Sequence, residues 1–188
     1  MLGLKRGESA LQDVLGRIAS GEMTLFDHFT GLEKPGVVLI DMQPDFVSGL
    51  REYVTARVVH MQKLVLAECA RLDIPAVALE YRRHGATIPE LAAALERVPR
   101  RNLIVKTNDD GFHGTDLKSV LTRFDVRSPV LMGINAHACV LQTADSGLRH
   151  GFAVKTSEDI IADQGSSGIY YSAKRWYEVN GCLLKAPG

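Results

Sequence analysis

The sequence predicts a three-layer α/β fold, in which helices cover both faces of a mainly parallel sheet. Two observations predict this fold. Short apolar runs alternate along the chain with longer amphipathic segments, a pattern typical of strand–helix–strand units. The runs are apolar at consecutive positions, so both faces of each strand are expected to be buried. A length of 188 residues suits one domain with a single core.

Six apolar runs are the expected strands, and the amphipathic segments between them are the expected helices. The strands are 36–42, 75–81, 102–107, 128–134, 152–157 and 182–186. The helices are 51–73, 88–98, 115–125, 138–151 and 168–181. Thr115 is placed to cap the third helix, and Gly151 is placed to end the fourth.

Residues 1–35 form an N-terminal extension to this pattern, and residues 36–188 form the domain itself. Apolar residues at helical spacing predict a helix over 9–20 within the extension. Three roles stay open for this segment: a clasp between subunits, a lid over a pocket, or only a longer start.

Composition excludes several classes of protein. Lys plus Arg and Asp plus Glu are equal at 22 each, which gives no electrostatic reason to expect nucleic acid or a membrane surface as partner. No apolar run approaches the roughly 18–20 residues that span a bilayer, and charges interrupt the N-terminus, so a cytoplasmic protein is expected. Three widely spaced cysteines, Cys69, Cys139 and Cys182, do not suit a disulfide framework or a cysteine-rich zinc site.

Three reactive side chains follow predicted strands. Asp41 and Lys106 end the first and third strands, and Cys139 opens the helix after the fourth. The carboxyl ends of parallel strands meet at one edge of a sheet, where ligands bind. Each residue also has an ordinary interpretation: a packed cysteine, a turn-capping aspartate and a solvated lysine. The combination favours a site because thiol chemistry needs all three groups.

The expected chemistry is nucleophilic attack by Cys139. A helix start and the Lys106 ammonium would favour the thiolate, and Asp41 would take the thiol proton and later return it. Attack on a carbonyl carbon creates an oxyanion, which backbone N–H groups in the turn "INAHAC" would receive. Water would then release the acyl group.

Three stretches resemble the isochorismatase-like cysteine hydrolases. They are "VVLIDMQPDFV" (37–47), "NLIVKTNDDGFHGTDL" (102–117) and "VLMGINAHACVLQTADSGLRHGFAV" (130–154), and the resemblance covers about residues 35–186. The family includes nicotinamidases, N-carbamoylsarcosine amidase and ureidoacrylate or biuret hydrolases. The resemblance implies a Rossmann-like fold with a six-stranded parallel sheet, an oligomeric protein, and a small amide, ureide or carbamoyl compound as substrate.

The resemblance also implies roles for individual residues. It maps an Asp–Lys–Cys triad onto Asp41, Lys106 and Cys139, which would form a thioester-type acyl-enzyme. It places a cis peptide bond at Ile134–Asn135, with the amides around Ala138 and Cys139 as oxyanion donors.

No cofactor and no metal are expected. Nicotinamidases bind a metal through an aspartate and two histidines, whereas the corresponding stretch here, "LEYRRHGATIPEL", lacks the histidine pair. Asp45 and His84 are two possible ligands, which is too few for a site.

Five further residues are candidates for the substrate pocket, each with a structural alternative. They are Gln43, Glu80, Tyr81, Phe112 and His137. Asn135, like Gln43, would either orient a substrate amide or cap a local turn.

Three other functions stay open beside the hydrolysis of a C–N bond. A vinyl-ether hydrolase of the isochorismate type needs no nucleophilic thiol, so Cys139 favours amide chemistry. A non-catalytic module would bind a small molecule or a partner chain on the same fold. A redox-active thiol protein would need a resolving cysteine near Cys139.

Overall fold

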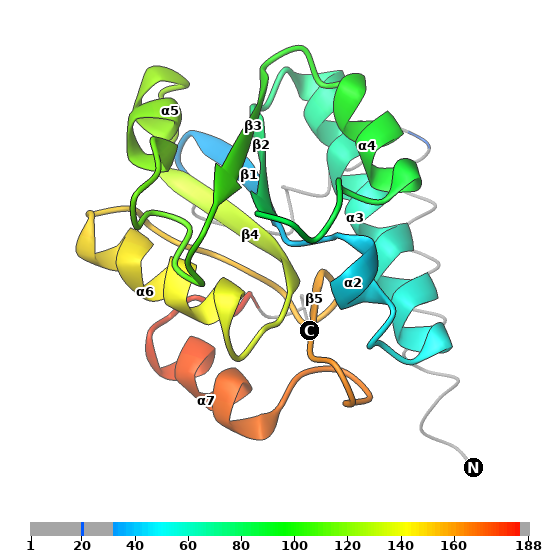
Figure 1. The fold of residues 1–188 in the computed structure, drawn as a ribbon. Coiled ribbons are helices and arrows are strands. Elements are labelled where there is room, and N and C mark those ends of the chain that lie inside the picture. The colour runs from blue at the N-terminus through cyan, green and yellow to red at the C-terminus, as the bar shows by residue number, and fades with distance from the viewer. Residues whose placement is uncertain (1–19, 21–31, 185–188) are drawn as a thin grey trace. The chain divides into compact units, whose positions relative to one another are not determined.

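The computed structural model describes residue 20 and residues 32–184. Within them, five parallel strands form one sheet in the order β3-β2-β1-β4-β5 (Figure 1). The strands are β1 (Pro35–Ile40), β2 (Ala76–Tyr81), β3 (Arg101–Lys106), β4 (Ser128–Ile134) and β5 (Ile161–Ala162). The helix expected over 9–20 and most of the extension 1–35 lie outside the described residues, so both stay predictions.

Helices cover both faces of the sheet, as the sequence predicts. The crossover helices α3 and α4 pack together on one face, and α5 and α6 lie on the other (Figure 1). This division follows from right-handed crossovers. The strands β2 and β3 are added on one side of β1, whereas β4 and β5 are added on its other side, so the connecting helices fall on opposite faces of the sheet. The helices are α2 (Pro44–Val47), α3 (Glu52–Leu72), α4 (Pro89–Glu96), α5 (Leu117–Arg123), α6 (Cys139–Arg149) and α7 (Tyr171–Val179).

The six-stranded expectation differs from the five strands that the described residues form. Lys155 makes only an isolated bridge to Val130, and Thr156 makes one to Leu183. The segment 152–157 bonds to β4 at Lys155, turns away, and returns as β5 at Ile161. The segments expected as the fifth and sixth strands, 152–157 and 182–186, are therefore joined to the sheet only by isolated bridges in the part that the structure describes.

Burial confirms the expectation for the central strands and contradicts it at the edge. β1 and β4 are buried along nearly their whole length. In β3, by contrast, Leu103 and Val105 are exposed while Ile104 and Lys106 are buried. β3 is the edge strand, and no described element covers the face that carries Leu103 and Val105.

The strand order creates a switch point between β1 and β4. From β1 the chain adds β2 and β3 on one side, and then adds β4 and β5 on the other side. The connections therefore leave β1 and β4 in opposite directions, which opens a crevice beyond the carboxyl ends of these two strands. The two strands approach closely because Gly133, paired with Ile40, has no side chain. A Cβ atom at Gly133 would lie 2.0 Å from the Ile40 carbonyl oxygen, and its φ of 141° suits glycine.

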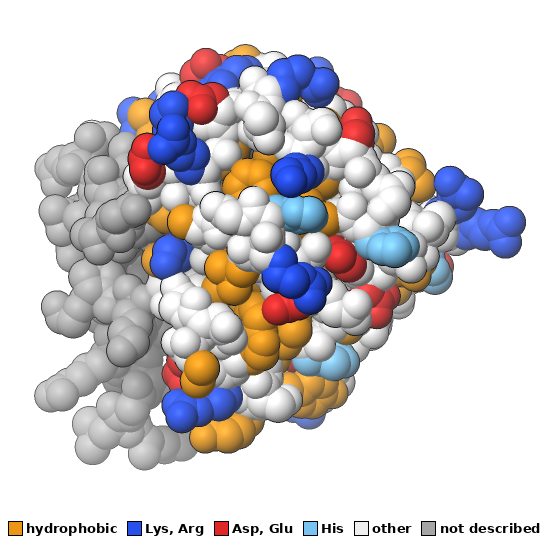
Figure 2. Space-filling model, turned by 90° about the vertical axis from the view of Figure 1, so that its left-hand side faces the viewer, with side chains coloured by type: hydrophobic (Ala, Val, Ile, Leu, Met, Phe, Trp, Pro, Cys, Tyr) orange, Lys and Arg blue, Asp and Glu red, His pale blue; other side chains and the backbone are white. Residues whose placement is uncertain are grey.

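The surface has no large area of one charge on the face turned to the viewer in Figure 2. There, Lys and Arg side chains are interspersed with Asp and Glu. This agrees with the equal numbers of basic and acidic residues in the sequence. None of the described helices is long and apolar enough to cross a membrane.

Candidate active site

Asp41 lies directly beyond the carboxyl end of β1, at the switch point. Its φ of 54° is a left-handed conformation that Asp tolerates better than most residues. Its N–H donates to the Leu79 carbonyl at 3.0 Å, and its carbonyl accepts from the Gln43 N–H at 2.8 Å. These backbone bonds hold Asp41, whose side chain is completely buried, at the carboxyl end of β1 and beside β2.

Lys106 reaches Asp41 from the end of β3, although β2 lies between the two strands. Its Nζ atom lies 4.3 Å from the centroid of the Tyr81 ring at the end of β2, and 2.7 Å from Asp41 Oδ2. Nζ also donates to the Asn108 carbonyl at 3.0 Å. The ammonium is as buried as the carboxylate, so each charge compensates the other and the ring face adds a further attraction.

Cys139 is the first residue of α6 and is almost completely buried. Its thiol and the Asp41 carboxyl interact closely enough for each to shift the pKa of the other. The thiol also donates to Asp109 Oδ1, with Sγ and Oδ1 3.5 Å apart. The structure thus brings Asp41, Lys106 and Cys139 together, as the strand ends predict.

Electrostatics at the thiol differ from the expectation of a stabilised thiolate. Burial raises the pKa of Cys139 most, the Asp41 carboxylate raises it further, and Lys106 lowers it only in part. Burial also raises the pKa of Asp41 above 3.8, while Lys106 opposes that shift. Lys106 is paired with Asp41 and not with sulfur, and the raised pKa of Cys139 favours the thiol over the thiolate in the resting site.

The arrangement suits transfer of the thiol proton to Asp41. Neither carboxylate oxygen of Asp41 makes a well-aligned hydrogen bond within the described chain, although Oδ2 is ion-paired with Lys106. A buried oxygen without a hydrogen-bond donor is rare and costly. Here it leaves acceptor capacity directed at the proton of Cys139 or of a bound molecule.

The turn before Cys139 contains a cis peptide bond at Ile134–Asn135, where the resemblance places it. The Ala138 N–H, expected to receive an oxyanion, already donates to the Asn135 carbonyl at 3.1 Å. The same carbonyl accepts the Val140 N–H at 3.1 Å. Among the described residues the Cys139 N–H has no such acceptor, which leaves it as the available donor at the start of α6.

Gln43 and Asn135 are held by the protein and are not directed at a substrate. Gln43 Oε1 accepts the Tyr81 N–H at 2.7 Å, and its Nε2 donates to the carbonyls of Tyr81 and Gly85. Asn135 Oδ1 accepts the Gln164 N–H at 3.0 Å, and its Nδ2 donates to the side chain of Gln164. Of the two alternatives for these residues, the geometry favours the local structural one.

Glu80 and Phe112 also differ from the pocket assignment. Glu80 Oε1 accepts both the N–H and the hydroxyl of Thr87, at 2.7 and 2.9 Å. The Phe112 ring packs against Phe152 and His150, with centroids 5.8 and 5.1 Å away. His150 directly follows α6, about 16 Å along the helix axis from Cys139. Phe112 is not among the residues that line the hollow with Tyr81 and Asp109.

His137 is anchored two residues before Cys139. Its N–H and Nδ1 both contact Oδ1 of the buried Asp163, at 2.9 and 2.6 Å, and its ring lies edge-on to Tyr170. Asp163 was not anticipated, because nothing in its local sequence marks it as a partner of the turn. Its Oδ2 accepts the Tyr170 N–H at 2.7 Å, so it also fixes the start of α7.

A hollow of about 440 Å³ lies against the triad. Two of its lining residues contact the triad directly: Tyr81, whose ring faces Lys106, and Asp109, which accepts from Cys139. The lining consists of Tyr81, Asn108, Asp109, Asp110, His113 and Gln142. Asp109 and Gln142 were missed, although each is three residues beyond a predicted triad member.

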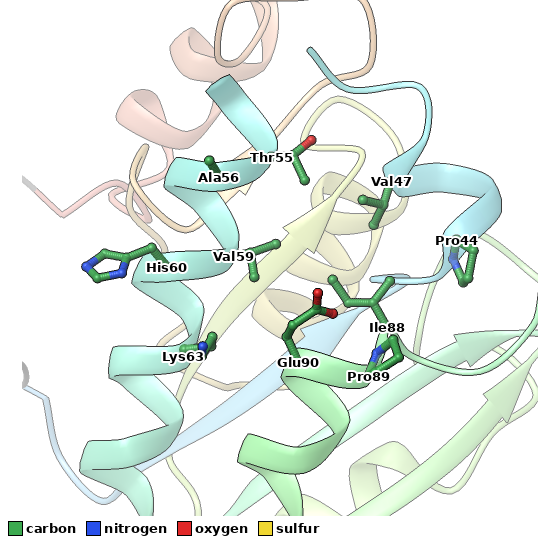
Figure 3. Close-up of a pocket in the computed structure, with 10 residues that line it drawn as sticks. All are labelled: Pro44, Val47, Thr55, Ala56, Val59, His60, Lys63, Ile88, Pro89 and Glu90. Carbon is green, nitrogen blue, oxygen red and sulfur yellow. The ribbon is translucent and has the colours of Figure 1, made fainter. Parts of the chain in front are cut away.

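A second hollow of about 580 Å³ lies between α2, α3 and α4, and its lining contains no triad residue (Figure 3). Asp45 directly follows the lining residue Pro44, and its Oδ2 lies 3.1 Å from His84 Nδ1. No described group of three or more His, Cys, Asp or Glu side chains is arranged to hold a metal. The expectation of a metal-independent site therefore stays a prediction.

The structure is an α/β protein with an aspartate, a lysine and a cysteine gathered at one edge of its parallel sheet. A family model described as the isochorismatase domain matches residues 35–175. The chain therefore belongs to the isochorismatase family.

Individual proteins agree with this assignment. The chain is 28% identical over 134 residues to a streptothricin hydrolase of Streptomyces noursei, covering 67% of this chain and 53% of that protein. It spans about half the length of the curated relatives that it matches.

Two solved structures share the fold. N-carbamoylsarcosine amidase from Thermoplasma acidophilum has a TM-score of 0.67 at 22% identity, covering 82% of this chain and 96% of the other. A nicotinamidase from Staphylococcus aureus has a TM-score of 0.69 at 18% identity, covering 82% and 98%.

Proposed function

We propose that this protein hydrolyses the C–N bond of a small amide, ureide or carbamoyl compound, with Cys139 as nucleophile. The observation that carries the proposal is the convergence of a thiol, a carboxylate and an ammonium at the switch point. Membership of the isochorismatase family supports it, and both structural neighbours described above are named as amidases.

Asp41 is the general base and acid in this proposal. It takes the thiol proton as Cys139 Sγ forms a bond to the carbonyl carbon, so no free thiolate accumulates in the resting enzyme. The Cys139 N–H donates to the oxyanion. Asp41 then returns the proton to the leaving nitrogen, the C–N bond breaks, and a thioester remains.

Water completes the cycle. Asp41 accepts a proton from the attacking water, the C–S bond breaks, and the sulfur recovers a proton as the acid is released. Lys106 keeps a positive charge against Asp41 throughout, which compensates the buried carboxylate whenever it has lost its proton.

Substitution of the nucleophile tests the proposal. In Cys139→Ala, turnover of any amide found in a screen should fall by at least about a thousandfold, because the covalent route is lost. Cys182→Ala removes another buried thiol and should retain activity. Ammonia release measures the rate in each protein. In the parent protein, mass spectrometry should detect an acyl adduct on the peptide that contains Cys139.

A substantial residual rate in Cys139→Ala would contradict covalent catalysis. Ligands that raise the melting temperature without being turned over by the parent protein would instead support the non-catalytic module. A cytoplasmic location and a homo-oligomeric state stay predictions from the sequence and the family resemblance.

A further inference from the structure

Asp109 places a second carboxylate at the thiol. It lies in the loop between β3 and α5, three residues after Lys106, and is only partly exposed. Its Oδ1 accepts from Cys139 Sγ at 3.5 Å, and its Oδ2 accepts from Gln142 Nε2 at 3.1 Å. Gln142 lies one helical turn beyond Cys139, so α6 holds both the nucleophile and the group that orients Asp109.

The lining of the hollow beside Asp109 contains two carboxylates and one histidine, His113. Asp109 and Asp110 both line it, and the lining includes neither Lys nor Arg. Lys106 is buried, is paired with Asp41 at 2.7 Å, and is not part of the lining. A bound molecule in this hollow therefore meets two carboxylates: Asp109, which contacts the sulfur, and Asp110, whose Oδ1 also accepts the Phe112 N–H at 2.8 Å.

Asp41 gives a second, independent indication of a ligand. It is completely buried and interacts with the thiol; its Oδ2 is ion-paired with Lys106, whereas its Oδ1 has no hydrogen-bond donor among the described residues. Cys139 thus lies between two carboxylates with one ammonium to compensate them. Both carboxylates raise the pKa of Cys139, so the resting site opposes formation of the thiolate.

We propose that Asp109 is a specificity-determining residue that selects substrates with a cationic nitrogen, an ammonium or a guanidinium, close to the scissile amide. The inference rests on the proposed role of Cys139 as nucleophile. The cation binds Asp109 through a charge-assisted hydrogen bond and holds the carbonyl at Sγ. It also neutralises the carboxylate that disfavours the thiolate, so the correct substrate helps to activate its own nucleophile.

Charged thiol reagents test this selection without a known substrate. The probes are 2-aminoethyl methanethiosulfonate, a cation, and 2-sulfonatoethyl methanethiosulfonate, an anion of similar size. In each reaction Sγ forms a disulfide bond with the reagent, and methanesulfinate leaves with the electron pair. Peptide mass spectrometry gives the labelling rate at Cys139, and free 2-mercaptoethanol gives the intrinsic ratio of the two reagents.

The cation-to-anion ratio at Cys139 should exceed that of 2-mercaptoethanol and should fall by about tenfold in Asp109→Asn, the size expected for one charge-assisted contact. Asp109→Ser should behave alike. The matched control is Asp116→Asn, which removes the same charge from an exposed residue of the same loop that makes no side-chain cap bond. The preference should also weaken from low salt to about 1 M salt.

Equal ratios in the parent protein and Asp109→Asn would overturn the inference, and so would a parent ratio no higher than that of the free thiol. Labelling needs no turnover, so this outcome is independent of the hydrolysis assay. If Cys139→Ala loses hydrolysis while the thiol of the parent protein shows no preference for the cationic reagent, the proposed function is retained and the role of Asp109 is rejected.

Discussion

Lys106 and Asp41 illustrate how two buried charges depend on one another. They end strands that are not neighbours, and the Lys106 ammonium passes over the Tyr81 ring at the end of the intervening strand, β2. Removing one partner of a buried pair leaves the other charge uncompensated, which costs more than removing both. The pair therefore contributes to folding as well as to the proposed chemistry.

Lys106→Met tests the structural part of this role. The free energy of unfolding should fall by about 3–5 kcal/mol, because the Asp41 carboxylate loses its ion pair. Lys118→Met changes an exposed lysine of α5 and should cost less than about 0.5 kcal/mol. Urea unfolding followed by circular dichroism measures both.

The double variant Asp41→Asn/Lys106→Met should be more stable than Lys106→Met, since it buries no lone charge. A double variant that is less stable than the single one would contradict this account of the pair.

The pH dependence of activity follows from the pKa of Asp41. The general base must be ionised, and its pKa is raised above 3.8, so kcat/KM should fall with decreasing pH at a midpoint above 3.8. No loss from thiol ionisation is expected up to pH 9, because the pKa of Cys139 is raised above 9.0. An acid midpoint at or below 3.8, in a kcat/KM profile on an identified amide, would exclude Asp41 as the base.

Asp109→Asn should move that acid midpoint to lower pH. The Asp109 carboxylate contributes to the raised pKa of Asp41, and its removal takes away one repulsive charge. Asp116→Asn again serves as the control.

At the scale of elements, the turn before α6 is held by residues between positions 163 and 177. Asp163 binds His137, Gln164 binds Asn135, and the Tyr177 hydroxyl of α7 donates to the Ala136 carbonyl at 2.7 Å. The position of the nucleophile therefore depends on contacts with residues that follow it by at least 24 positions.

The close approach of β1 and β4 predicts that Gly133→Ala is poorly tolerated. The new Cβ would overlap the Ile40 carbonyl oxygen in the sheet, so we expect a loss of at least about 3 kcal/mol. Gly151→Ala is the matched control, since φ is also positive, at 86°, but no described atom lies within 4 Å of the added Cβ. It should cost about 1 kcal/mol.

Thermal and urea unfolding compare the two alanine variants. Equal losses in Gly133→Ala and Gly151→Ala would show that backbone conformation alone matters, and that the packing of β1 against β4 does not depend on glycine.

At the scale of the whole molecule, the alternation of apolar runs with amphipathic segments predicted the layers and the parallel sheet. It also predicted that Asp41, Lys106 and Cys139 meet, because the carboxyl ends of parallel strands share one edge. The sheet edges were predicted less well. Whether 152–157 forms a strand depends on which hydrogen-bonding groups of β4 pair with Lys155 and which pair with β5. The local sequence does not encode this pairing.

The sequence by itself determined the fold class and the edge of the sheet at which Asp41, Lys106 and Cys139 meet, since these depend on local periodicity and on topology rules. Only the tertiary structure decided which polar groups face the thiol. Glu80 and Tyr81 are consecutive strand residues and point to opposite faces, so they could not both enter one hollow. The path of the loop after β3 selects Asp109 over its neighbours, because the contact with α6 joins segments 30 residues apart.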